Sequence, residues 1–225
     1  MSFNFFNFQI YEFLSKQNHY LKNNFSNEDK VAKPTYDFLD LNSERLSGIA
    51  SFIGLNILLL FFIITFNYEQ FVELPKATAN QLAEETHERV GAVIGSIVMA
   101  IVVIMFYFKG SFNFDKKAKF LKILAQIWVF LNAILVISAM LKNTEYVYYL
   151  GLTYKRLGVY AFLSLAIIGL IFTFIKVSKQ KTNAYLFNQM FWYVYGTILV
   201  CSFINWGGII TSHNLERKDF AANYH

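Results

Sequence analysis

The feature that most constrains this chain is a series of long apolar stretches without a charged residue. Four of them lie between charged residues, at Arg45 and Glu69, Arg89 and Lys109, Lys122 and Lys142, and Arg156 and Lys176. Each holds about 19 to 23 residues, the length that a helix needs to cross about 30 Å of bilayer hydrocarbon. A fifth apolar stretch runs over 184–211. The sequence therefore predicts an all-α, polytopic membrane protein with about five transmembrane helices, near 46–66, 90–108, 118–140, 157–177 and 184–211.

The composition argues against a soluble domain. Hydrophobic residues make up 56 % of the chain and charged residues 16 %, whereas about 25 % of the residues in soluble domains are charged. A helix in a soluble core keeps a charged stripe toward water, and these stretches have none. The net charge of +5 does not indicate a nucleic-acid partner, because the basic residues flank the apolar stretches, as in loops that meet anionic lipid headgroups. The single cysteine, Cys201, excludes an intrachain disulfide.

The chain divides into three parts. Residues 1–45 form an N-terminal cytoplasmic or interfacial segment, in which Phe6, Ile10, Phe13 and Leu14 have the spacing of an amphipathic helix. Residues 46–211 form the five-helix transmembrane domain, and residues 212–225 form a C-terminal tail. Counted over alternate loops, about ten Lys and Arg residues lie on the side of the amino end and about seven on the other side. This bias predicts a cytoplasmic N-terminus.

Small and polar residues within the predicted helices indicate how the helices pack. Gly91 and Gly95 have the four-residue spacing at which two helix backbones approach closely, so they predict a tight helix contact. Gly207 and Gly208 mark a place for a bend in the fifth helix. Four amide side chains would be unpaired if they faced hydrocarbon: Asn56, Gln126, Asn132 and Asn205. Either they form hydrogen bonds between helices, or they line a polar path through the membrane.

Two groups of residues near predicted helix ends are candidates for ligand binding. Lys155 and Arg156, with Tyr154 beside them, could hold the phosphate of an anionic lipid or a carboxylate, or act as ordinary interfacial anchors. His87 and Glu88 could handle a proton, although a solvated helix cap is the simpler interpretation. The four histidines are too scattered to predict a metal site, and no cofactor motif occurs.

One catalytic pattern occurs, in the segment EETHER. Glu84, Glu85 and Arg89 match the Glu-Glu-x-x-x-Arg signature of intramembrane proteases of the abortive-infection and prenyl-protein type. A hydrolase of this kind also needs a buried histidine from a later helix, and none occurs between His87 and His213. We therefore assign no catalytic residue.

Several motifs, in order along the chain, resemble a bacterial family of multi-pass membrane proteins. They are FLDLNSERLSG, ETHERVGAVIGSI, FYFKGSFNF, IWVFLNAILVISAMLKN, YYLGLTYKRLGVYAFL and FINWGGIITSHNLER. The most specific is the Tyr-x-Gly-Leu-Thr-x-x-Arg run from Tyr149 to Arg156. Over about 38–217 the chain is similar to the domain of unknown function numbered 4153, which has a sister numbered 4173.

This resemblance implies a location in the bacterial inner (cytoplasmic) membrane. Members of the family begin with further membrane helices and end with a longer tail, so we expect the chain to match the later part of the family pattern. The resemblance implies no catalytic activity, cofactor or substrate, because the family is defined by sequence and not by a reaction.

Taken together, the sequence favours a non-enzymatic inner-membrane component that binds other membrane proteins or lipids in a bacterial envelope complex. The alternative is a permease or transporter subunit with a polar path near Asn132 and Asn205. A membrane-embedded hydrolase around Glu84, Glu85 and His87 is the third and weakest hypothesis.

Overall fold

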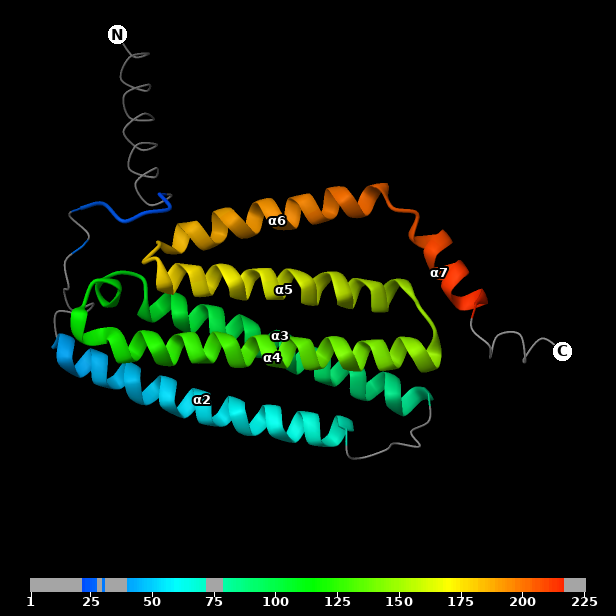
Figure 1. Cartoon of the computed structure of the whole chain (residues 1–225), viewed down its shortest axis with the longest axis horizontal. Coiled ribbons are helices and arrows are strands. Elements are labelled where there is room, and N and C mark those ends of the chain that lie inside the picture. Colours follow the sequence, from blue (N-terminus) through cyan, green and yellow to red (C-terminus); the bar gives the residue numbers. More distant parts are fainter. Residues whose placement is uncertain (1–21, 28–29, 31–39, 72–78, 217–225) are drawn as a thin grey trace, which may run out of the picture.

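The chain is a bundle of long helices (Figure 1). The structure is a computed structural model that describes residues 22–27, 30, 40–71 and 79–216. It is 86 % helical, and no strand occurs among these residues. The elements are α2 (Leu41–Phe71), α3 (Ala79–Tyr107), η1 (Ser111–Asn113), η2 (Lys116–Ala118), α4 (Lys119–Leu150), α5 (Tyr154–Ser178), α6 (Asn183–Phe203) and α7 (Trp206–Leu215). The all-α prediction is confirmed.

The predicted membrane spans correspond to these helices. Four of the described helices are long and apolar enough to cross a membrane, and a fifth span results if α6 and α7 are counted together. α4 lies at the centre and packs against α2, α3 and α5, while α6 packs on the outer side of α5 (Figure 1). The predicted amphipathic positions Phe6, Ile10, Phe13 and Leu14 lie outside the described residues.

The helices meet at two ends of the bundle (Figure 1). At one end, which we call the α3–α4 end, lie the start of α2 and the connections from α3 to α4 and from α5 to α6. At the opposite end, which we call the α4–α5 end, lie the end of α2, the start of α3 and the connections from α4 to α5 and from α6 to α7.

The third predicted helix is longer than expected. α4 continues past 140 to Leu150, so most of the segment that was expected to be a loop is helical. No glycine or proline occurs within 119–150. Gly151, which follows, has a φ of 83° and donates its N–H to the carbonyl of Val147 at 2.8 Å. A glycine adopts this left-handed conformation without a steric cost, and it ends the helix there.

The fifth predicted helix is broken. α6 and α7 meet at 66°, with the break at Ile204 and Asn205 and not at the predicted glycine pair. Asn205 caps α7, since its Oδ1 accepts the N–H of Gly208 at 3.0 Å. A Cβ at Gly208 would lie 2.9 Å from Asn205 Nδ2, so the glycine leaves room for the capping amide.

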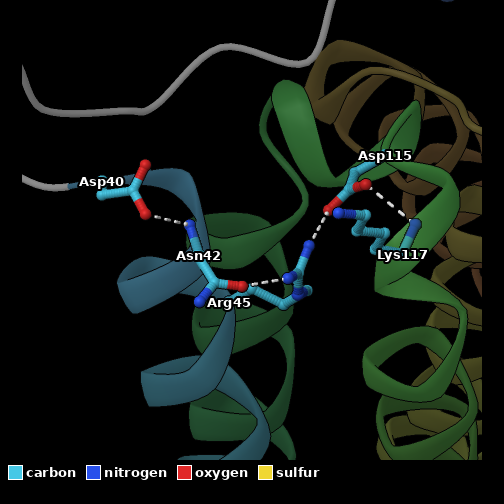
Figure 2. A network of polar contacts seen from close by, with 5 residues as sticks. All are labelled: Asp40, Asn42, Arg45, Asp115 and Lys117. Atoms are coloured by element: carbon cyan, nitrogen blue, oxygen red, sulfur yellow. Dashed lines mark hydrogen bonds and ion pairs between the residues drawn. The ribbon is translucent and has the colours of Figure 1, made fainter.

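An ionic network fastens the start of α2 to the α3–α4 connection (Figure 2). Arg45 forms an ion pair with Asp115 at 3.0 Å and a hydrogen bond with Asn42. The side chains of Arg45 and Asp115 are 15 % and 9 % exposed. Asp115 also accepts the N–H of Lys117 at 2.8 Å and so caps η2, while Asp40 accepts the N–H of Asn42 at 3.3 Å. One carboxylate thus ties together two segments that lie 70 residues apart.

Lysine and asparagine side chains satisfy backbone carbonyls beside this network. Lys176, a fully buried residue of α5, donates to the carbonyl of Phe108 at 2.8 Å, and Asn113 donates to the same carbonyl at 2.9 Å. Lys122 of α4 donates to the carbonyl of Asn113 at 2.7 Å. The last carbonyls of a helix have no partner within the helix, so these side chains complete the end of α3 and join it to α4 and α5.

We expect Asp115→Asn to lower the free energy of unfolding in detergent by about 1.5–3 kcal/mol, the range for a hydrogen bond to a charged group. The amide keeps an oxygen for the N–H of Lys117 but leaves the Arg45 guanidinium without an anion. Denaturant unfolding followed by circular dichroism measures the change. Lys116→Gln alters an exposed charge of the same connection and should change stability by less than about 0.5 kcal/mol. An Asp115→Asn effect of the same size in an Arg45→Gln background would contradict the ion pair.

Candidate functional site

A pocket opens at the α4–α5 end of the bundle. It measures about 450 Å³, within the usual range for small-ligand sites. We call it the α4–α5 pocket, and its lining comes from α3, α4, α5 and the α4–α5 connection: Val90, Asn143, Tyr146, Thr153, Tyr154, Lys155, Arg156 and Val159. It brings together three of the five predicted ligand-binding residues, Tyr154, Lys155 and Arg156.

The α4–α5 connection positions the cationic side of this pocket. Thr153 caps α5 by accepting the N–H of Arg156 at 3.5 Å. Arg156 turns back and donates one guanidinium N–H to the carbonyl of Gly151, and its guanidinium lies 3.9 Å from the centre of the Tyr146 ring. Stacking on an aromatic ring and a backbone hydrogen bond together fix the plane of the guanidinium.

Asn143 provides a polar group in the pocket wall that lacks a partner. The residue is 1 % exposed, and its Nδ2 donates to the carbonyl of Arg156 at 3.2 Å. Its Oδ1 accepts no hydrogen bond from any described residue. A buried acceptor without a donor costs about 1–3 kcal/mol. The oxygen has less than 1 Å² of accessible surface, so a hydrogen-bond donor on a ligand would recover that free energy once the Asn143 side chain turns toward the pocket.

Glu145 is the described carboxylate nearest in sequence to Lys155 and Arg156, and it does not neutralise them. Glu145 is paired with Lys142 at 3.0 Å. Lys155 is exposed, and no hydrogen bond or ion pair joins it to a described residue. The guanidinium of Arg156 has five N–H donors, of which a described backbone carbonyl accepts one. Among the described residues, no carboxylate therefore neutralises the two cations of the pocket.

The C-terminal helix α7 is fastened to the connection beneath the pocket. Asn214 accepts the N–H of Leu152 at 2.8 Å and donates to its carbonyl at 2.9 Å. A Cβ at Gly207 would lie 3.1 Å from the Tyr154 hydroxyl oxygen, so this aromatic ring packs closely on the start of α7. Asn143 and Asn214 were not predicted as site residues. The motifs that carry the family resemblance contain both of them, as well as Tyr149–Arg156, which is the signal that could have found them.

The side chains of the predicted site residues in α3 are not described. The backbone of His87 and Glu88 lies in α3, but their side chains are outside the described part of the chain, as are those of Glu84 and Glu85. Val90, in the same helix, lines the pocket. Among the described residues, no group of His, Cys, Asp and Glu is arranged to hold a metal ion.

The predicted close contact at Gly91 and Gly95 is not made with any described residue. Both glycines are exposed, and a Cβ at either position would meet nothing within 4 Å. The neighbouring position Val93 is fully buried instead. The packed face of α3 is therefore rotated away from the glycine pair, because larger apolar side chains fill the contact with α4.

Each polar side chain within the spans forms its hydrogen bond at a different place in the bundle. Asn56 of α2 donates to the carbonyl of Leu124 in α4 at 3.1 Å. Asn132 of α4 accepts the hydroxyl of Ser96 in α3 at 2.9 Å. Gln126 donates to Ser178 of α5 at 2.9 Å. Asn205, as described above, caps α7. Three of these amides lie at separate helix contacts and the fourth caps its own helix, and together they do not line any one of the three cavities found among the described residues.

We expect Asn214→Ala to release α7 from the α4–α5 connection, because it removes both hydrogen bonds to Leu152. Two hydrogen bonds contribute about 1–3 kcal/mol in total. Hydrogen–deuterium exchange should accelerate for the amides of 206–215 and for Leu152 while α4 and α5 stay protected. Ser212→Ala is the control on the same helix, since the Ser212 hydroxyl contacts only its own turn at 3.4 Å among described residues. Equal exchange in the two variants would contradict the attachment.

Comparison with known proteins places the chain in a family. No curated protein and no solved structure shows significant similarity to the chain. The family model described as "Domain of unknown function (DUF4153)" matches residues 5–224. This match spans nearly the whole of the 225-residue chain and includes α2 to α7 and the α4–α5 pocket. The chain therefore belongs to the family of the domain of unknown function DUF4153.

Proposed function

We propose that this protein is a non-enzymatic component of a bacterial inner membrane that binds membrane lipids or other membrane proteins within an envelope complex. The observation that carries the proposal is the α4–α5 pocket, whose lining includes Lys155 and Arg156, neither of which forms an ion pair with a described carboxylate. A pocket of this size that holds such cations favours a bound molecule over a closed structural contact.

The arrangement of the intramembrane amides supports binding over transport. A transport route needs polar groups that line a continuous path across the hydrocarbon. Asn132 lies buried between α4 and α3, whereas Asn205 lies at the break between α6 and α7. Because each amide already has a partner on a neighbouring helix or on its own, the hydrogen bonds serve helix association.

Nothing described supports the hydrolase hypothesis. A hydrolase centred on Glu84, Glu85 and His87 would need a second histidine or another base from the packed helices. His213, the histidine whose side chain is described, is exposed on α7. The proposal therefore assigns no reaction to the protein.

The proposed orientation places the α3–α4 end in the cytoplasm and the α4–α5 pocket on the opposite face. The basic residues support this assignment, since the α3–α4 and α5–α6 connections carry clustered lysines. The pocket would then meet lipids of the outer leaflet of the inner membrane.

The binding function predicts that the full chain retains membrane components during purification. After extraction of bacterial membranes in a mild detergent, native mass spectrometry should detect the chain with phospholipid or with a stoichiometric protein partner. The retained component should survive detergent washing that removes bulk lipid. A bare monomer that restores a transport phenotype in cells would overturn the proposal in favour of the transporter alternative.

The proposed orientation is tested separately by cysteine labelling in intact spheroplasts. In a Cys201→Ser background, Ser212→Cys places a thiol at the α4–α5 end, and Lys116→Cys places one at the α3–α4 end. Both positions are exposed. A membrane-impermeant maleimide should label the first position in intact spheroplasts and the second only after permeabilisation. The reverse pattern would show that the N-terminus faces outward.

A further inference from the structure

The level of the α4–α5 pocket within the membrane determines which ligands can reach it. At this end, the charge-free stretch of α4 ends at Lys142 and that of α5 begins after Arg156. Each stretch of about 19 residues measures about 28 Å, close to the thickness of the hydrocarbon. Asn143 and Arg156 therefore lie where hydrocarbon meets the lipid headgroups.

Aromatic side chains around the pocket agree with that depth. Tyr148, Tyr149 and Tyr154 are exposed by 75 %, 60 % and 66 %, and all three lie at the α4–α5 end. Exposed tyrosines are typical of the interface between hydrocarbon and water. A lipid headgroup has direct access to a pocket at this level.

Arg156 and Lys155 are suited to bind a phosphate group. Arg156 is held in place by the Gly151 carbonyl and the Tyr146 ring, and it keeps further N–H donors. Lys155 lies next to it in the lining and extends to the surface. Arginine and lysine at a membrane interface bind the phosphate group of a lipid through charge-assisted hydrogen bonds.

The buried oxygen of Asn143 adds a second requirement. An acceptor needs a donor, which a phosphate diester alone does not provide. A hydroxyl or an ammonium on the headgroup would provide one. The two neighbouring cations disfavour an ammonium, since like charges at close range repel. The combination therefore matches an anionic headgroup that carries a hydroxyl.

We propose that the α4–α5 pocket binds the headgroup of an anionic phospholipid of the phosphatidylglycerol type, with the phosphate on Arg156 and Lys155 and a glycerol hydroxyl donating to Asn143 Oδ1. This inference rests on the proposed binding function and names the class of ligand. It is specific in two respects, the charge of the headgroup and its hydroxyl.

The charge requirement is tested with the full chain in nanodiscs that contain equal amounts of phosphatidylglycerol and phosphatidylethanolamine. After release into detergent, native mass spectrometry should find phosphatidylglycerol retained about 10-fold over phosphatidylethanolamine, equivalent to about 1.4 kcal/mol. Lys155→Gln should reduce that ratio several-fold, and Arg156→Gln should abolish it. Lys179→Gln removes an exposed charge at the opposite end of α5 and should leave the ratio unchanged.

Each contrary result has a defined meaning. Equal retention of the two lipids by the wild-type chain overturns this inference but leaves the proposed binding function standing. Retention of neither lipid nor protein overturns both. An equal effect of Lys155→Gln and Lys179→Gln also overturns it, because the preference would then reflect overall charge. Lys155 is exposed, so its variant remains informative if Arg156→Gln does not fold.

The hydroxyl requirement is tested with phosphatidylmethanol, a phosphate diester of the same charge as phosphatidylglycerol whose headgroup has no hydroxyl. The wild-type chain should prefer phosphatidylglycerol over phosphatidylmethanol, and Asn143→Leu should remove that preference. Equal retention of the two lipids by the wild-type chain would overturn the role of Asn143. Millimolar glycerol phosphate and inorganic phosphate distinguish the source of the ligand, since displacement of the lipid by either would show a site for free phosphate esters. Failure of both to displace it supports the lipid.

Discussion

Hydrocarbon does not hydrogen-bond, and the whole structure follows from how the chain meets that constraint. Every backbone group in a span must be paired within a helix, and every polar side chain must find a partner on another helix or on its own. Asn56 and Asn132 pair across α2, α3 and α4 in this way. Lys176 does the same at the end of α3, where its ammonium reaches a backbone carbonyl of another helix. Because these contacts converge on α4 and its neighbours, α4 becomes the centre of the bundle.

The two ends of the bundle meet the same constraint differently. At the α3–α4 end, Asp115 neutralises Arg45 and caps η2, so an acidic group is matched to a cation within the chain (Figure 2). At the α4–α5 end, Arg156 rests on an aromatic ring and a carbonyl, neither of which carries a full negative charge. At the α3–α4 end, the ion pair between Arg45 and Asp115 therefore stabilises the fold. At the other end, Lys155 and Arg156 form no ion pair with a described carboxylate, which supports the proposed binding role.

The spans were predictable because lipid imposes a length and forbids charge, and both can be counted along a single sequence. The ends were less predictable. Gly151 ends α4, whereas the polar residues after 140 do not, because the buried Lys142 is paired with Glu145 one turn later in the same helix. Lys155 and Arg156 were found through their charge. Asn143 and Asn214 were missed because their roles depend on contacts across 13 and 62 residues. The spacing of Gly91 and Gly95 permits a close contact but does not require one.

The attachment of α7 has a thermodynamic consequence. Asn214 forms hydrogen bonds with the N–H and the carbonyl of Leu152. Leu152 lies between Gly151, which ends α4, and Thr153, which caps α5. A molecule that ordered this junction would strengthen the attachment of α7. Binding of a protein to α7 would change the stability of the junction by an equal free energy, because such linkage is reciprocal. The two hydrogen bonds of Asn214 therefore couple the stability of α7 to that of the α4–α5 junction.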